Sequence, residues 1–396
     1  MTNDGYAGLC TDIGFQSLNK YGEELCGDNV VVVHPNDETT IVVLADGLGS
    51  GVKASILSTL TSKIISTMMA QNMTLADCVS AIAETLPVCN VREIAYSTFT
   101  ILSIKNNRRA EVIQYDNPRV ILLRNGRHYE FPVTTAILDG KKILKSEFSL
   151  EENDTFVIIS DGVEHAGVEK TLNFGWQRKD IIDFLQSLYK NDYTAKALTT
   201  FLLDQCYILY AGQPGDDTTV CTVKIRRRKA VNLLIGPPQK PDDVSRMMSL
   251  FFGKSGRHIV CGGTTSTLAA EFLGKELVAG LPEYIDPEIP PTAKIEGVDL
   301  VTEGVITLSR VLEYARDFTG RNSLYSHWSM KNDGASQISR MLFEEATDVN
   351  FFVGRAINPA HQNPDLPIGF SIKMHLVDEL VSQLKAMGKL AKSIYF

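Results

Sequence analysis

The chain has 396 residues, 44% hydrophobic and 22% charged, which is enough apolar material for two domain cores and excludes a disordered chain or a disulfide scaffold. The formal net charge is −8, whereas nucleic-acid binders usually carry a basic face, so no nucleic-acid partner is expected. The longest apolar runs, such as 41–45, are far too short to cross a bilayer. Seven cysteines without a CxxC pair indicate reduced thiols, so we expect a cytoplasmic protein with no membrane partner.

The first half of the chain predicts short strands in pairs, with helices between them. The Asn125-Gly126 pair is a strong hairpin signal, because both residues tolerate positive φ. The β-rich runs are 30–34, 40–45, 98–104, 110–116, 120–124, 128–131, 155–160 and 218–225. Helical periodicity covers 53–71, 75–86, 178–190 and 194–210, and the first places Ile56, Leu60, Ile64 and Met68 on one apolar stripe. These patterns predict antiparallel sheets covered by helices in a layered α+β domain.

The pattern changes after Ile225, where the charged run 226–229 marks a boundary. Strands are expected over 231–235, 258–261, 298–302 and 350–353, and helices over 242–252, 266–273, 305–317 and 337–345, with a final helix ending at 387. The Pro-rich piece 282–291 is expected to be a loop. Strands that alternate with helices predict an α/β domain with a mostly parallel sheet. We therefore expect two domains, 1–228 and 229–396.

Four acidic motifs border predicted strands of the first domain. Adjacent strands lie under ~5 Å apart, so carboxylates at strand ends can converge. Converged carboxylates repel one another and resist ionisation unless a cation neutralises them. Oxygen ligands suit Mg²⁺ or Mn²⁺, and few histidines lie near the motifs, which disfavours zinc. The motifs are Gly27-Asp28-Asn29, Asp46-Gly47, Asp161-Gly162 and Gly215-Asp216-Asp217.

Two other interpretations of these motifs are open. Asp-Gly is a common turn dipeptide, and only the joint arrangement of the motifs favours a metal site over separate turns. The glycine-rich stretch 47–51 resembles a phosphate-binding loop, but Val52 stands where the dinucleotide motif needs its third glycine. Val52 also stands where a P-loop needs glycine directly before Lys53.

These motifs, in this order, resemble the metal-dependent protein serine/threonine phosphatases (type 2C). The bacterial branch typified by the stage II sporulation protein E phosphatase is the most similar, over residues of about 1–226. The resemblance implies a layered α-β-β-α sandwich with a metal site at one edge. The segments that carry it are Ala45-Asp46-Gly47-Leu48-Gly49-Ser50-Gly51, Asn117–Gly126, Asn153–Glu164 and Gly215-Asp216-Asp217-Thr218-Thr219-Val220.

The resemblance also implies roles for individual residues. Asp46 would bridge two ions, Gly47 would offer its carbonyl to the second, and Asp28 would lie beside that ion. Asp161 and Asp216 would complete the coordination of the first ion. Asp46, Asp161 and Asp216 are therefore the expected catalytic residues. Leu48 replaces the histidine of the animal enzymes, and residues 23–25 lack their phosphate-binding arginine. The general acid and the phosphate clamp are therefore unassigned.

The implied activity is a metal-dependent phosphoprotein phosphatase. Two Mn²⁺ or Mg²⁺ ions would lower the pKa of a shared water, and the resulting hydroxide would attack phosphoserine or phosphothreonine. The expected substrate is a phosphorylated regulatory partner in bacterial signalling. The alternative is a catalytically degenerate phosphatase fold that serves as a binding or scaffold protein in a signalling complex.

The second domain matches no family, and we expect it to sense a small ligand or bind a protein partner. In a parallel sheet, ligands favour loops at the carboxyl ends of strands. One such loop could bind an anion at a helix start, and it consists of Gly262, Gly263, Thr264, Thr265 and Ser266. The alternative is that Thr265 or Ser266 caps the helix. A small-molecule enzyme is a third possibility for this domain.

Overall fold

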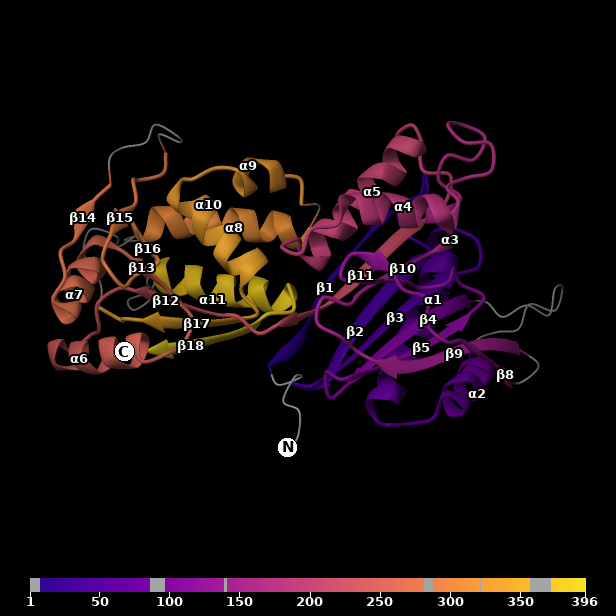
Figure 1. Ribbon diagram of the computed structural model, residues 1–396, viewed down its shortest axis with the longest axis horizontal. Helices are drawn as coiled ribbons and strands as arrows, with labels where there is room; N and C mark the ends of the chain where they lie inside the picture. Colours follow the sequence, from indigo (N-terminus) through magenta and orange to yellow (C-terminus); the bar gives the residue numbers. More distant parts are fainter. Residues whose placement is uncertain (1–7, 86–96, 139–140, 281–287, 321, 357–371) are drawn as a thin grey trace. The chain divides into compact units, whose positions relative to one another are not determined.

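The protein divides into two compact units, Met1–Arg227 and Arg228–Phe396 (Figure 1). The computed structural model describes residues 8–85, 97–138, 141–280, 288–320, 322–356 and 372–396. Each unit has its own sheets and hydrophobic clusters. Among the described helices, none is long and apolar enough to span a membrane.

The first unit contains two antiparallel sheets, with strand orders β2-β3-β4-β5-β9-β8 and β1-β11-β10-β6-β7. Helices α1 (Gly51–Ala70) and α2 (Leu75–Thr85) belong to the first layer, and α3 (Asp161–Glu164), α4 (Arg178–Leu188) and α5 (Ala195–Leu209) to the second. Helix α1 packs on β2 and β3, while α5 packs on β1 and β11. The expected α-β-β-α sandwich is confirmed. The strands are β1 (Leu9–Leu18), β2 (Asp28–Asn36), β3 (Thr39–Gly47), β4 (Ser97–Lys105), β5 (Arg109–Tyr115), β6 (Ile121–Arg124), β7 (Arg127–His128), β8 (Thr134–Leu138), β9 (Lys141–Ser149), β10 (Thr155–Ile159) and β11 (Thr218–Arg227).

Strand β3 is buried on both of its faces. Val42 and Leu44 join the core between the two sheets, which also holds Phe156 of β10. Ile41 and Val43 face the other way and pack with Ile65 of α1. An unbroken apolar run is what a strand covered on both sides requires. This strand carries Asp46 at its end, so the site begins on one of the most enclosed strands of the unit.

The orientation of α1 differs from the predicted one. Ile56 and Leu60 of the predicted apolar stripe are 53% and 42% exposed. The buried face instead carries Ala54, Ser58 and Ser62, together with other small residues. Small side chains let the helix axis approach the sheet closely, and the hydroxyl of Ser62 bonds to the Ser58 carbonyl and accepts a hydrogen bond from Asn29 of β2. Periodicity identified the helix but not its inner face.

The second unit is built on one seven-stranded sheet of order β14-β15-β16-β13-β12-β17-β18. Strands β16 (Leu300–Thr302), β13 (Arg257–Cys261), β12 (Ala230–Ile235), β17 (Asp348–Val353) and β18 (Leu390–Tyr395) are all parallel. The short strands β14 (Val278–Ala279) and β15 (Ala293–Lys294) add antiparallel pairs at one edge. The expected mostly parallel sheet is confirmed. The Pro-rich prediction 282–291 lies largely outside the described residues.

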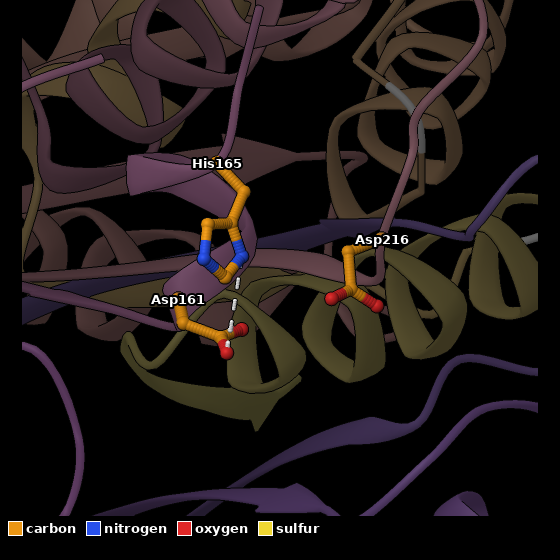
Figure 2. A group of neighbouring side chains, drawn as sticks. All are labelled: Asp161, His165 and Asp216. Carbon is orange, nitrogen blue, oxygen red and sulfur yellow. Dashed lines mark ion pairs between the residues drawn. The ribbon is translucent and has the colours of Figure 1, made fainter. Parts of the chain in front are cut away.

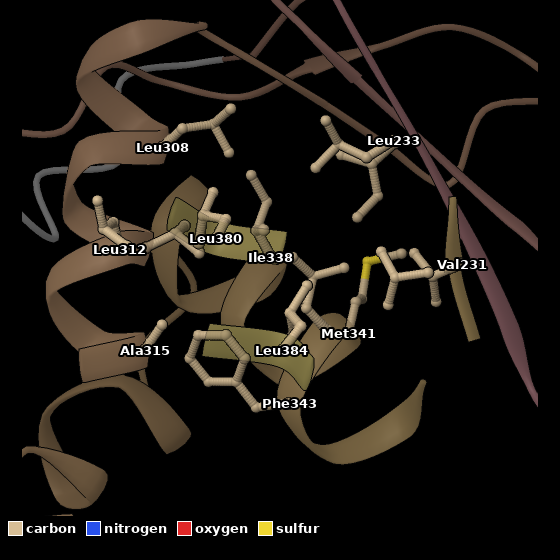
Figure 3. Packing of buried hydrophobic residues seen from close by; sticks show 14 of the residues in the cluster. Val231, Leu233, Leu308, Leu312, Ala315, Ile338, Met341, Phe343, Leu380 and Leu384 are labelled. Carbon is tan, nitrogen blue, oxygen red and sulfur yellow. The ribbon is translucent and has the colours of Figure 1, made fainter. Parts of the chain in front are cut away.

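Helices cover this sheet with well-packed apolar faces. Figure 3 shows Leu308, Leu312 and Ala315 of α8 (Val305–Thr319) meeting Leu380 and Leu384 of α11. The predicted helix 337–345 is α10 (Gly334–Ser339) followed by a π-helical turn, η3 (Arg340–Glu345). The other helices of the unit are η2 (Pro241–Asp243), α6 (Val244–Phe252), α7 (Gly263–Leu273), α9 (Tyr325–Ser329) and α11 (Ile372–Ala386).

One ion pair beneath the sandwich gives a test of the fold. Asp154, whose side chain is fully buried, accepts two hydrogen bonds from the Arg124 guanidinium at 2.8 and 2.9 Å. Glu151 bonds to the same guanidinium, but its side chain is 55% exposed. We expect Asp154→Ala to lower the free energy of unfolding by about 3 kcal/mol, because the largely buried Arg124 charge loses two hydrogen bonds and keeps only the exposed Glu151 as its acidic partner among the described residues. The matched Glu151→Ala should cost under about 1 kcal/mol in urea unfolding, and equal losses would contradict this ranking.

Candidate metal centre

Two of the predicted acids face each other across neighbouring strands. Asp28 begins β2 and Asp46 lies next to the end of β3, and they are direct partners in the antiparallel register. Directly opposed residues place their side chains on the same face of a sheet. The strand ends are fixed by backbone bonds, since the Gly47 amide donates to the Gly27 carbonyl at 3.1 Å and the Ser97 hydroxyl donates to the Asp46 carbonyl at 2.7 Å.

The other acids come from the second sheet. Asp161 begins α3, separated from the end of β10 by one residue, and Asp216 and Asp217 directly precede β11, which pairs with β10. The Thr219 amide donates to the Ser160 hydroxyl at 2.8 Å and fixes these two strand ends together. Oxygens of Asp161 and Asp216 and a ring nitrogen of His165 all lie within 4.8 Å of one another (Figure 2).

Electrostatics joins the two pairs into one cluster. The pKa of Asp46 is raised to about 9, first by burial and then by the charges of Asp28 and Asp161, with smaller effects from Asp216 and Asp217. Burial also raises the pKa of Asp28 to about 7, against the hydroxyls of Thr219 and Ser160. Burial and the charge of Asp161 raise the pKa of Asp216, and the charge of Lys20 offsets only part of this rise. The structure therefore brings Asp28, Asp46, Asp161 and Asp216 together.

Two carboxylates in this region, those of Asp28 and Asp217, have oxygens without ordinary hydrogen-bond partners in the described part of the chain. Asp28 is 6% exposed, and neither of its oxygens accepts a hydrogen bond of normal geometry from the described residues. Asp217 is 4% exposed; one oxygen accepts from the Lys20 amide at 3.0 Å, while the other is buried without a partner there. Buried carboxylate oxygens of this kind normally have partners. Asp217 is therefore a member of the cluster for which sequence reasoning gave no role.

His165 is the second residue that the sequence did not identify. It follows Asp161 by four residues, and its Nδ1 lies 3.9 Å from the Asp161 carboxylate. The two side chains are 55% and 48% exposed, so this nitrogen stands at the open side of the cluster. The signal was present in the sequence, since residues four apart on a helical turn share a face.

The glycines of the Asp-Gly motifs have a packing role. A Cβ on Gly47 would lie 2.1 Å from the Ala54 carbonyl oxygen of α1, and one on Gly162 would lie 2.1 Å from the Asp217 carbonyl oxygen. The buried Tyr210 hydroxyl also donates to the Gly162 carbonyl at 2.6 Å. Backbone segments cross directly over both glycines, and this close approach needs residues without a side chain. The Gly47 carbonyl as a metal ligand remains a prediction.

The loop predicted to bind a ligand in the second unit is used largely by the fold itself. Helix α7 begins at Gly263 and has Gly262 at its N-cap, so capping by Thr265 or Ser266 is wrong. Both residues are buried inside the first turns; Thr265 accepts from the Gly236 amide and Ser266 donates to the Gly262 carbonyl. Gly263 and Thr264 are exposed at the helix start. Ligand binding by this loop remains a prediction.

A family match agrees with this arrangement. Residues 36–226 match the family described as Stage II sporulation protein E (SpoIIE). The match covers just under half of the chain, and this segment resembles the SpoIIE family. It contains Asp46, Asp161 and Asp216, while Asp28 lies just before it. No curated protein matches the chain.

Solved structures similar to this chain include phosphatase domains. One is the PP2C phosphatase domain with a fragment of the regulatory domain of SpoIIE from Bacillus subtilis, at 18% identity and a TM-score of 0.48, over 56% of this chain and 64% of that one. The RsbU and RsbW domains of Rv1364c from Mycobacterium tuberculosis match at 14% identity and 0.44, over 61% and 66%. The catalytic domain of PstP in complex with two manganese ions matches at 16% and 0.38, over 55% and 99%. The chain thus spans less than two thirds of the SpoIIE structure, and the resemblance to SpoIIE rests on the family match.

The residues of this site fit a hard divalent cation. Carboxylate oxygens dominate the donor set, and orphaned oxygens of Asp28 and Asp217 are buried inside it. The pKa values of Asp28 and Asp46 are raised first by burial and also by neighbouring acids, and a bound cation would offset both effects. Oxygen-rich clusters of this kind are typical of Mg²⁺ and Mn²⁺ sites.

Stability should depend on pH in a defined direction when metal is absent. The pKa of Asp46 is raised from 3.8 to about 9, so the folded state retains a proton that the unfolded chain loses. The free energy of unfolding should therefore fall as pH rises from about 4 to 9. We expect Asp46→Asn to raise the melting temperature of metal-free protein at pH 8.5 by about 2–4 °C, the effect of ~1 kcal/mol in a domain of this size.

The same variant should lose the stabilisation that Mn²⁺ gives to the natural protein, as measured by differential scanning fluorimetry. Asp192→Asn is the control, since Asp192 is an exposed acid of the same unit. A metal-free melting temperature of Asp46→Asn below that of the natural protein at pH 8.5 would contradict the inferred repulsion.

Proposed function

We propose that the protein is a metal-dependent serine/threonine phosphatase that acts on a phosphorylated regulatory partner protein. The observation that carries the proposal is the convergence of Asp46 with Asp161 and Asp216 from two different sheets in a domain that resembles the SpoIIE family. If the Asp-Gly motifs were only separate turns, which is the alternative interpretation, their carboxylates would have no reason to lie close together. The proposed location is the cytoplasm, on the grounds of the cysteine pattern.

The chain's own residues would act by holding charge in place. Asp46, Asp161 and Asp216 would hold two Mn²⁺ or Mg²⁺ ions, with Asp28 beside them and the Gly47 carbonyl as a further ligand. Such a pair of ions would supply Lewis-acid activation of water and neutralise charge on the phosphoryl oxygens. The short β10–α3 and β11 connections keep the carboxylates in register, so little reorganisation is needed when substrate arrives.

A binding or scaffold protein with a degenerate phosphatase fold is the second candidate. It would have no reason to keep buried carboxylates that lower its own stability. The retained acids Asp28, Asp46, Asp161 and Asp216 therefore favour the enzyme.

Turnover of p-nitrophenyl phosphate and of a phosphoserine peptide, with and without Mn²⁺, tests the proposal. We expect Mn²⁺-dependent hydrolysis that Asp46→Asn and Asp216→Asn reduce by at least about 10²-fold, as losing a main electrostatic contribution does. Asp192→Asn should retain full activity. If the natural protein hydrolyses neither substrate in Mn²⁺ or Mg²⁺, the scaffold alternative replaces the enzyme.

His165 gives a separate prediction about metal preference. An imidazole nitrogen suits Mn²⁺ better than Mg²⁺, and this one lies beside Asp161 and Asp216. We expect His165→Ala to weaken Mn²⁺ binding by about tenfold, the low end for a lost partner at a metal site, and Mg²⁺ binding by much less. Isothermal titration calorimetry measures both affinities. His128→Ala is the control, because His128 pairs with Glu130 rather than with the cluster, and an equal loss for both metals would contradict a ligand role for His165.

A further inference from the structure

The second unit contains a pocket at the amino ends of its parallel strands. Its volume is about 660 Å³, within the range of small-molecule sites. It lies at the start of β12, β13, β17 and β18, at the opposite ends of the strands from the Gly262–Ser266 loop. The lining residues are Arg228, Lys229, Ala230, Val231, Lys254, Ser255, Gly256, Arg257, Glu345, Asp348, Asn350, Leu390 and Lys392.

Positive charge dominates this lining in a chain of net charge −8. Five of its side chains are basic and two are acidic. Both acids are already engaged, because Asp348 pairs with Arg228 at 3.2 Å and Glu345 pairs with Arg257. Lys229, Lys254 and Lys392 form no ion pair with any carboxylate that the structure describes. The pocket therefore holds three lysine ammonium groups without counter-charges.

The negative ends of nearby helix dipoles neutralise only part of this positive charge. Helices α6 and α11 and the π-turn η3 end close to Lys254, Leu390 and Glu345 of the pocket lining. Each helix C-terminus is equivalent to about half a negative charge, so three of them offset about 1.5 units. The formal excess of basic over acidic side chains is twice that amount.

Polar contacts and a close backbone approach fix the Ser255–Arg257 wall of the pocket. Asn232 is fully buried in the centre of the sheet, where its amide donates to the Ser255 carbonyl at 3.1 Å and its side-chain oxygen accepts from Asn350 at 2.9 Å. A Cβ on Gly256, whose φ is +110°, would lie 2.3 Å from the Ala230 carbonyl oxygen. Asn232 is buried and its partner Asn350 is half-buried; here the pair replaces apolar packing between central parallel strands, and Asn232 holds the Ser255–Arg257 turn that forms one wall.

We propose that this pocket binds a small polyanion, a molecule with two or more phosphate groups. Three unpaired ammonium groups in one concavity match more than one phosphate, because lysine recognises phosphate as a point charge. The apolar side chains of the lining are few (Ala230, Val231 and Leu390), which leaves charge as the main source of affinity. The site is independent of the metal centre and of phosphatase activity.

Isothermal titration calorimetry on the full-length protein in metal-free buffer tests the site. The probes are sodium pyrophosphate, ADP and inorganic phosphate, and metal removal leaves the acidic cluster of the first unit to repel them. We expect pyrophosphate and ADP to bind at least tenfold more tightly than inorganic phosphate. ADP binding more tightly than pyrophosphate would assign the site to nucleotides, and the reverse order would assign it to inorganic polyphosphates; both support a polyanion.

Paired variants locate the binding. Lys254→Ala/Lys392→Ala should weaken pyrophosphate at least tenfold, whereas the control Lys240→Ala/Lys385→Ala, which removes two exposed lysines of the same unit outside the lining, should change it less than twofold. Unchanged melting temperatures of both double variants show that they fold. The proposal fails if the natural protein binds none of the three probes, or if both double variants weaken pyrophosphate equally.

Discussion

Repulsion among carboxylates at one edge of the sandwich is the constraint on which the rest of the first unit depends. At an effective dielectric constant of about 20, two unit charges about 4 Å apart repel by ~4 kcal/mol. That is a large part of the ~5–15 kcal/mol by which whole domains are stable. Burial adds to this repulsion, and the two together raise the pKa values of Asp28 and Asp46 in the metal-free chain, with burial as the larger cause. The remaining structure must keep these groups together against this force.

The packing around the cluster supplies that restraint. Strand β3 is enclosed on both faces, and α1 lies so close to its end that Gly47 has no space for a side chain. Gly162 is crowded in the same way by the backbone at Asp217. The serine-rich inner face of α1 permits this close approach, because larger side chains would hold the helix further from the sheet. Stability is thus concentrated in the strands, and unfavourable charge is confined to their ends.

Much of this arrangement could be predicted from sequence, because β-rich runs and Asp-Gly motifs are local signals. The hairpin at Asn125-Gly126 forms as predicted, with positive φ at both residues. The inner face of α1 could not be predicted, because apolar periodicity assigns burial to large residues and gives no weight to close approach. Strand β1 mixes polar and apolar residues, and its pairing with β11 and packing against α5, which the sequence does not show, order it. The place of His165 beside Asp161 follows from their local spacing, whereas the grouping of Asp217 with Asp28 and Asp46 depends on contacts between segments distant in the chain.

The cluster draws its ligands from both layers of the sandwich. Asp28 and Asp46 belong to the six-stranded sheet, and Asp161 and Asp216 border strands of the five-stranded sheet. The apolar side chains between the layers are held by non-directional burial, which would tolerate a small sliding of one sheet over the other. A cation held by both pairs of acids would link the two sheets through directional bonds. It would thereby fix their alignment at the edge of the hydrophobic core.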